Sequence, residues 1–217
     1  PPPAYEKQEV GEPNQTAGQQ CANEGVQSDA PPGGWLFRIA TFDSMTGKAG
    51  ELVEAFRRRR VDVACVQESR WKGAGTRLFG GNDGRYKFFW QGAKNGYAGV
   101  GVFVAEKWIE HIVGIDRIRE RIIGIKMVMG KMLVNVLSVY APQVGRSEEE
   151  KDEFWNKVIQ VVNSIPKNEK IILAGDLNGH VGKCSDGYTG IHGGFGYGRR
   201  NAEGGRILEF GDAVGMV

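Results

Sequence analysis

The sequence lacks the features that mark membrane, secreted and zinc-finger proteins. Its longest apolar runs, such as 132–141, are interrupted by polar residues well short of the roughly 20 apolar residues that a membrane-spanning helix needs. No positively charged start followed by an apolar stretch opens the chain, so a secretory signal is not expected. The three cysteines are an odd number without C-x-x-C spacing, which argues against a disulfide framework or a zinc site. These absences predict a nuclear or cytoplasmic protein with reduced thiols and no membrane partner.

The composition is that of one globular domain with a polar tail. The 217 residues are 41% hydrophobic and 25% charged, which is ordinary for a folded domain. Residues 1–34 hold six of the eight prolines, one base and five acids, and almost no large apolar side chains. We therefore expect a disordered tail at 1–34 and a domain at 35–217. The net charge of +2 conceals a basic domain behind an acidic tail, which fits a polyanionic partner without proving one.

Short apolar runs alternate with amphipathic stretches from residue 35 onward, as in strands and helices packed in layers. The expected strands are 36–42, 61–67, 86–91, 99–105, 122–129, 132–139 and 170–174. Ser147 with Glu150 forms a capping-box pattern that opens a helix, and Pro166 closes it. Apolar stripes at 52–56 and 207–210 predict two further helices. The pattern indicates an α/β fold.

Polar side chains gather at the C-terminal ends of four of these strands, in 40–43, 66–69, 138–142 and 174–179. Ligands collect at such ends in α/β sheets because the backbone turns there and leaves a crevice. This coincidence predicts a single site.

Each of these side chains also has a purely structural interpretation. Glu68 could cap a loop or bind Mg²⁺, a hard cation that needs only one or two carboxylates beside water and phosphate. Asp176 and Asn178 could form an Asx turn, or they could face a common ligand if the chain bends between them. Tyr140 could be a packed aromatic residue with a satisfied hydroxyl.

Taken in order, the motifs T-F-D, V-Q-E-S, V-Y-A-P and G-D-L-N-G-H resemble the endonuclease/exonuclease/phosphatase superfamily. The resemblance is closest to the apurinic-type endonuclease domain of RTE/BovB-clade non-LTR retrotransposons, and it covers about residues 36–217. It implies a DNase I-like, four-layer α/β sandwich whose two sheets meet at a hydrolytic site. It also implies Mg²⁺, with Mn²⁺ as a substitute, and a nucleic-acid substrate, DNA above all.

The resemblance assigns roles residue by residue. Glu68 would be the metal ligand, with Asp43 beside it, and Tyr140 would support the phosphate or the nucleophile. Asp176 would orient or deprotonate the attacking water, and Asn178 would hold a phosphate oxygen. The substrate side of the site would include Asn201 and Arg70.

The sequence departs from the family pattern in two ways that concern activity. Asp43 stands where the family has asparagine, which removes an amide donor and adds a negative charge near the phosphate. The family's later strands and its final catalytic histidine have no counterpart, and His111, His180 and His192 lie in other contexts. We therefore expect a domain that is incomplete at its C-terminus and marginally stable by itself.

These departures leave two other functions open besides DNA nicking. One is a catalytically inactive module that binds nucleic acid or a protein, and the other is a phosphatase of the same superfamily. The oligomeric state cannot be predicted.

Overall fold

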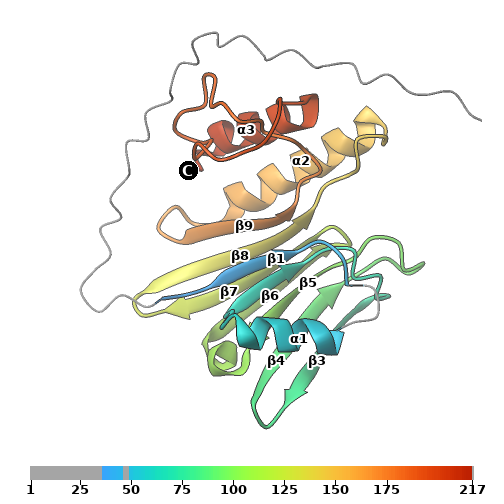
Figure 1. The fold of residues 1–217 in the computed structure, drawn as a ribbon, viewed down its shortest axis with the longest axis vertical. Coiled ribbons are helices and arrows are strands. Elements are labelled where there is room, and N and C mark those ends of the chain that lie inside the picture. The colour runs from blue at the N-terminus through green and yellow to red at the C-terminus, as the bar shows by residue number, and fades with distance from the viewer. Residues whose placement is uncertain (1–35, 46–48, 217) are drawn as a thin grey trace, which may run out of the picture. The chain divides into compact units, whose positions relative to one another are not determined.

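The computed structural model describes residues 36–45 and 49–216 (Figure 1). The tail expected at 1–34 lies outside the described residues. The elements follow one another in this order: β1 (Ile39–Phe42), α1 (Ala49–Arg58), β2 (Val63–Val66), β3 (Ala74–Gly81), β4 (Gly84–Gln91), β5 (Val100–Ala105), the 3₁₀ helix η1 (Glu106–His111), β6 (Ile112–Arg119), β7 (Ile122–Met129), β8 (Met132–Tyr140), α2 (Glu148–Ser164), β9 (Lys170–Asp176) and α3 (Ala202–Val214).

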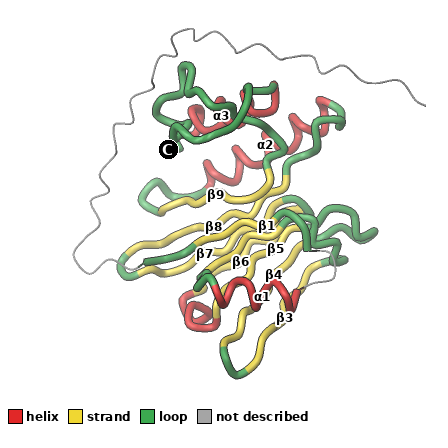
Figure 2. Tube along the Cα trace, viewed as in Figure 1, coloured by secondary structure: helices red, strands yellow, loops and turns green. Residues whose placement is uncertain are grey.

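The strands form two mixed sheets, with helices outside them (Figures 1 and 2). The first sheet has the order β1-β2-β5-β4-β3, and the second has the order β6-β7-β8-β9. The β1–β2 and β8–β9 pairs are parallel and the others antiparallel. This is the DNase I-like architecture that the sequence predicted.

The alternation of side chains along β8 explains the layering. Val134 and Val136 belong to the core that joins the two sheets, whereas Leu137 and Val139 pack with α2. Successive side chains of a strand point to opposite faces, so an apolar run with both faces covered is typical of a central layer. One of the two polar residues of this strand, Ser138, is completely buried on the side of the first sheet.

The start of α2 is where the capping pattern placed it. Ser147 is the N-cap, and its side chain accepts a hydrogen bond from the backbone N–H of Glu150 at 3.3 Å. The Glu150 carboxylate instead accepts from Arg121 at 3.1 Å. The reciprocal half of the capping box is therefore replaced by an ion pair. The helix ends at Ser164, two residues before Pro166.

The sequence analysis did not predict two of the strands, β3 and β6. β3 is mostly exposed and has glycines near both ends, and β6 alternates apolar with charged side chains around a glycine. Neither contains the continuous apolar run on which the prediction depended. Both are outer strands of their sheets, where one edge faces away from the other strands.

A buried carboxylate fixes the beginning of β2. Asp62 is 1% exposed and accepts hydrogen bonds from the Arg38 N–H and the Trp108 indole N–H, both at 2.8 Å. Lys107 Nζ lies 2.6 Å from Asp62 Oδ1, the same oxygen that accepts from Trp108. Burial acts to raise the pKa of Asp62, but the hydrogen bonds from Arg38, Lys107 and Trp108 outweigh it, so the pKa lies below its usual range.

Within the part of the chain that the structure describes, none of the helices is long and apolar enough to cross a membrane.

Candidate active site

The ends of four strands meet where the two sheets face each other. In the first sheet, Phe42 at the end of β1 pairs with Val66 at the end of β2. In the second sheet, Tyr140 at the end of β8 pairs with Asp176 at the end of β9. Tyr140 and Asp176 are thus the last residues of their strands, not the first residues beyond them.

Glu68 and Tyr140 join the two sheets directly. The Tyr140 hydroxyl donates a hydrogen bond of 2.5 Å to Glu68 Oε1. Burial raises the pKa of Tyr140 well above its usual range, and this hydrogen bond and the charge of Glu68 raise it further. Tyr140 is therefore a neutral donor that holds one oxygen of Glu68. Tyr140 is thus a packed aromatic residue with a satisfied hydroxyl, and the group that satisfies it is a site carboxylate.

The other oxygen of Glu68 is less constrained. Arg70 Nη2 lies 3.7 Å from Oε2, which is longer than a hydrogen bond, and the Arg70 side chain is largely exposed. Glu68 and Arg70 both have positive φ angles, 47° and 54°, which bend the chain away from the direction of β2. This bend leaves Glu68 Oε2 available to a cation.

The carboxyl groups of Asp43 and Asp176 make a second contact between the two sheets. Loss of solvation raises the pKa of Asp43, the negative charges of Asp176 and Glu68 raise it further, and so does a hydrogen bond with Asp176. A cation bound beside these carboxylates would offset their mutual repulsion. Three of the predicted side chains therefore concentrate negative charge at one place.

Asn178 lies in a bend of the chain just after β9, the bend that would let Asp176 and Asn178 face a common ligand. Its φ is 48°, and its backbone N–H donates to Asp176 Oδ1 at 2.8 Å, so the Asx turn is present. Its side-chain amide donates to the Ala141 carbonyl at 2.8 Å. The donor that was expected to face a phosphate is thus engaged with the end of β8. Its role toward a phosphate stays a prediction.

Gly175 permits this arrangement, and its replacement provides a test of it. Its φ is 151°, and an added Cβ would lie 1.9 Å from the Val139 carbonyl oxygen. We expect Gly175→Ala to lower the free energy of unfolding by at least about 2 kcal/mol, measured by urea denaturation. Gly205→Ala is the control. Nothing lies within 4 Å of a Cβ there, so this helical substitution is expected to stabilise by about 0.5–1 kcal/mol.

Asn201 has a structural role that the sequence prediction missed. It is the N-cap of α3, and its Oδ1 accepts from the backbone N–H groups of Gly204 at 2.8 Å and His180 at 2.9 Å. An asparagine just before a helix is a common capping signal, so this role was legible in the sequence. Its predicted contact with substrate stays untested.

Two of the three histidines make their side-chain contacts elsewhere. His192 is buried and bonds to the Gly182 carbonyl, while His111 packs edge-on against Trp108. His180 is exposed, close in sequence to Asn178.

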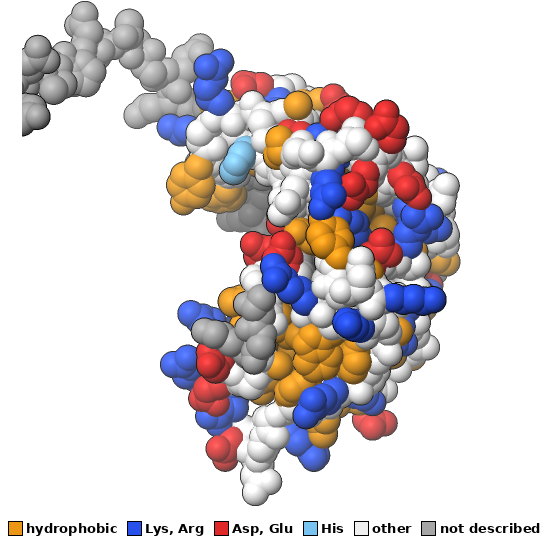
Figure 3. Space-filling model, turned by 90° about the vertical axis from the view of Figure 1, so that its right-hand side faces the viewer, with side chains coloured by type: hydrophobic (Ala, Val, Ile, Leu, Met, Phe, Trp, Pro, Cys, Tyr) orange, Lys and Arg blue, Asp and Glu red, His pale blue; other side chains and the backbone are white. Residues whose placement is uncertain are grey.

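A polar cleft of about 500 Å³ opens beside Glu68 and Tyr140. Besides those two residues, its walls include Arg70, Tyr97 and Arg146. The Arg146 guanidinium lies over the Tyr97 ring, 5.0 Å from its centroid, and also donates to the Tyr97 hydroxyl. One side of the molecule is visibly hollowed in Figure 3, where basic and acidic side chains are interspersed. Sequence analysis did not identify Tyr97 or Arg146, because both lie in loops that no motif marks.

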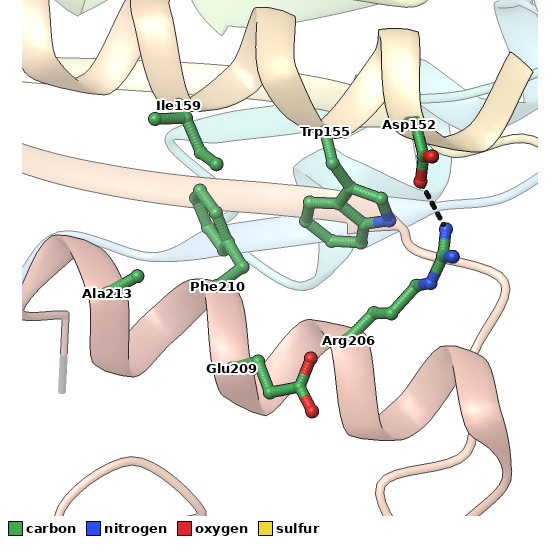
Figure 4. A pocket seen from close by; sticks show the side chains of 7 residues that line it. All are labelled: Asp152, Trp155, Ile159, Arg206, Glu209, Phe210 and Ala213. Atoms are coloured by element: carbon green, nitrogen blue, oxygen red, sulfur yellow. Dashed lines mark ion pairs between the residues drawn. The ribbon is translucent and has the colours of Figure 1, made fainter. Parts of the chain in front are cut away.

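A second hollow, of about 370 Å³, lies between α2 and α3 and is mostly apolar. Figure 4 shows Trp155, Ile159 and Phe210 facing one another there, with Arg206 paired to Asp152 at the rim. None of the predicted site residues lines it. Trp155 is partly buried there and packs against Phe210 of α3.

The site residues suit a divalent cation. Within residues 36–45 and 49–216, no three His, Cys, Asp or Glu side chains form a complete ligand cage. Mg²⁺ does not need one, since it keeps several waters and binds one or two carboxylates together with substrate phosphate. Glu68 Oε2 lies 3.7 Å from Arg70, beyond hydrogen-bond distance, and the negative charges of Asp176 and Glu68 beside Asp43 are ones that a cation would neutralise. Cys65 is unsuited to ligation or nucleophilic attack, because burial raises the pKa of its thiol to about 12.

Comparison with known sequences agrees with this picture. The profile described as the Endonuclease/Exonuclease/phosphatase family matches residues 26–206. Craniofacial development protein 2 of Bos taurus is 27% identical over 164 residues, which cover 76% of this chain and 27% of that protein. The protein of the same name from Tragulus javanicus is 26% identical over 164 residues. The chain thus spans about a quarter of the length of these relatives.

Solved structures show the same fold at low sequence identity. The endonuclease domain of TRAS1, a telomere-specific non-LTR retrotransposon, is 14% identical with a TM-score of 0.51, over 82% of this chain and 71% of that one. The AP endonuclease LMAP from Leishmania major is 13% identical with a TM-score of 0.53, over 82% of this chain and 66% of that one. The resemblance seen in the motifs therefore extends to the fold.

Proposed function

This chain belongs to the endonuclease/exonuclease/phosphatase family, and on that premise we propose that it hydrolyses phosphodiester bonds of nucleic acid with the help of Mg²⁺ or Mn²⁺. The observation that carries the proposal is the meeting of Asp43, Glu68, Tyr140 and Asp176 at four strand ends from two sheets. Such a set combines cation ligands, a neutral donor and a carboxylate for the water proton.

The residues divide the work as follows. Glu68 and Asp43 would hold the cation, which when bound stabilises negative charge on the phosphate oxygens. Tyr140 keeps Glu68 oriented through the 2.5 Å hydrogen bond. Asp176, whose Oδ1 accepts from the Asn178 N–H, would orient the attacking water and accept its proton. Arg70 and Arg146 at the wall of the cleft would attract the phosphate backbone.

DNA is the substrate class that we favour. The two structures of similar fold described above are an endonuclease domain of a non-LTR retrotransposon and an AP endonuclease. The motif resemblance also leads us to propose descent from a retrotransposon endonuclease. These similarities support a DNA-nicking activity.

A catalytically inactive nucleic-acid-binding module is the second candidate, and Asp43 is the observation that favours it. Its carboxyl group adjoins Asp176 and Glu68, which concentrates negative charge where a phosphate must approach. Salt-sensitive but magnesium-independent binding of DNA without cleavage would support this candidate.

The proposal is tested by comparing substrates under one set of conditions. The purified chain is incubated with Mg²⁺ and supercoiled plasmid, single-stranded oligonucleotide, p-nitrophenyl phosphate or an inositol polyphosphate. We expect nicking of the plasmid and no comparable release of phosphate from the monoesters. If only the monoesters were hydrolysed, the chain would be a phosphatase and not a nuclease.

Replacement of Tyr140 by phenylalanine tests the contact with Glu68. Loss of one hydrogen bond to a charged group is worth about 1.5–3 kcal/mol, so we expect Tyr140→Phe to lower the nicking rate roughly 10- to 100-fold. Tyr86→Phe is the matched control, because Tyr86 also donates a buried hydrogen bond, 2.7 Å to the Val61 carbonyl, outside the site. Equal rates for the two variants would remove Tyr140 from the mechanism.

A further inference from the structure

A buried amide connects the two sheets directly beneath the site. Gln67 is 0% exposed. Its Oε1 accepts a hydrogen bond of 3.0 Å from the Thr41 hydroxyl, and its Nε2 donates one of 3.1 Å to Ser138 Oγ. Thr41 lies on β1, and Ser138 is fully buried on β8 of the opposite sheet. The amide thus ties three strands that belong to both sheets.

Each of these three residues lies one or two positions before a site residue. Thr41 precedes Asp43 by two positions, and Ser138 precedes Tyr140 by two. Ser138 and Tyr140 both belong to β8, and because side chains two apart on a strand point to the same face, Ser138 lies below the side chain that it would align. Thr41 belongs to β1, and Asp43 is the first residue beyond the end of that strand. Gln67 is adjacent to Glu68, whose positive φ turns its own side chain into the site.

Stability alone does not call for an amide here. Gln67 is fully buried, as is Val66 before it, and a well-packed apolar side chain at such a position would cost nothing in desolvation. A buried amide is favourable only when its hydrogen bonds are made, and they are made at one relative placement of the sheets. The amide therefore selects one inter-sheet register over others of similar packing.

We propose that Gln67 is a positioning residue whose two hydrogen bonds, to Thr41 and Ser138, set the spacing between the strand ends that carry Asp43, Glu68 and Tyr140. Gln67 does not touch substrate or metal. It acts on the reaction by keeping the Tyr140 hydroxyl against Glu68. This inference rests on the proposed function only where a reaction rate is concerned.

The test uses Gln67→Met, which keeps the shape of the side chain and removes both hydrogen bonds. Asn135→Leu is the matched control, since Asn135 is another buried amide on β8, bonded to Glu169 and Lys170 outside the site. The first readout is the ¹⁹F resonance of Tyr140 in protein labelled with 3-fluorotyrosine, recorded without metal and assigned with Tyr140→Phe. The second is kcat for nicking, corrected for the folded fraction.

We expect Gln67→Met to shift the Tyr140 resonance and to lower kcat at least about tenfold with a smaller change in KM, because small misplacements of reacting groups carry large rate penalties. Asn135→Leu is expected to lose stability while keeping both readouts. If Gln67→Met does not fold, Ser138→Ala, which removes one of the two hydrogen bonds, takes its place with the same expectations.

The inference is overturned if the Tyr140 resonance of the folded Gln67 or Ser138 variant stays at the wild-type position, or if Asn135→Leu moves it equally. These NMR outcomes do not depend on catalysis. A wild-type chain that cleaves nothing would therefore refute the proposed function, while the resonance still decides the role of Gln67.

Discussion

Glu68→Gln and Asp176→Asn are each expected to lower the rate of plasmid nicking by on the order of 10³-fold, with little change in melting temperature. Glu68→Gln removes the negative charge that binds the cation, and Asp176→Asn removes the carboxylate that accepts the water proton. Both substitutions preserve shape and relieve repulsion among neighbouring carboxylates, so the fold is not expected to suffer. Single-turnover nicking at saturating Mg²⁺ measures the effect.

Glu169→Gln is the control for charge removal as such. Glu169 bonds to Lys126 and Asn135, apart from the site residues, and its loss should leave nicking within about twofold while lowering stability slightly. If either site variant retained wild-type nicking, its carboxylate would have no part in the chemistry.

Asp62→Ala is expected to have the largest effect on stability, a loss of about 3–5 kcal/mol in the free energy of unfolding. The substitution takes the buried carboxylate away from the Arg38 N–H and the Trp108 indole, which donate hydrogen bonds to it, and from the exposed Lys107, which pairs with it. Urea denaturation at neutral pH measures the loss. Asp83→Asn is the control, because the pair of Asp83 with Arg57 is exposed and at 3.5 Å is worth less than about 1 kcal/mol.

The same carboxylate makes stability depend on pH in one direction. The folded pKa of Asp62 is lowered, so its contribution is fully present above the unfolded pKa of about 4 and is lost as pH falls through the folded value. Asp62→Asn should therefore flatten the decline in stability below about pH 4. A variant as acid-sensitive as the wild type would contradict the assignment of this charge.

Strands with continuous apolar runs and the helix with a capping signal were predictable, because local pattern determines them. β7 and β8 were located by the run on each side of Gly130-Lys131, and α2 by Ser147 and Pro166. β3 and β6 were not, because β3 is largely exposed, β6 interrupts its apolar residues with charged ones, and their pairing is decided by neighbouring strands.

The site residues also fall into those that the sequence predicts and those that only the structure reveals. Asp43, Glu68, Tyr140 and Asp176 stood out because polar groups at the ends of buried strands lack a local reason to be there. Tyr97 and Arg146 come together only when two separate loops fold, so their spacing in the sequence does not predict their contact. Gln67 was within a noted motif, but its bridge to Ser138 spans both sheets and is visible only in three dimensions.

The most direct test of the account is the dependence of nicking on the divalent cation, measured side by side for wild type and Glu68→Gln. Protein stripped with EDTA is expected to leave supercoiled plasmid intact, added Mg²⁺ to restore nicking, and Glu68→Gln to remain at least about tenfold below wild type at every Mg²⁺ concentration. Cleavage that persists in EDTA, or the same Mg²⁺ dependence in both proteins, would contradict a metal-assisted phosphodiesterase centred on Glu68.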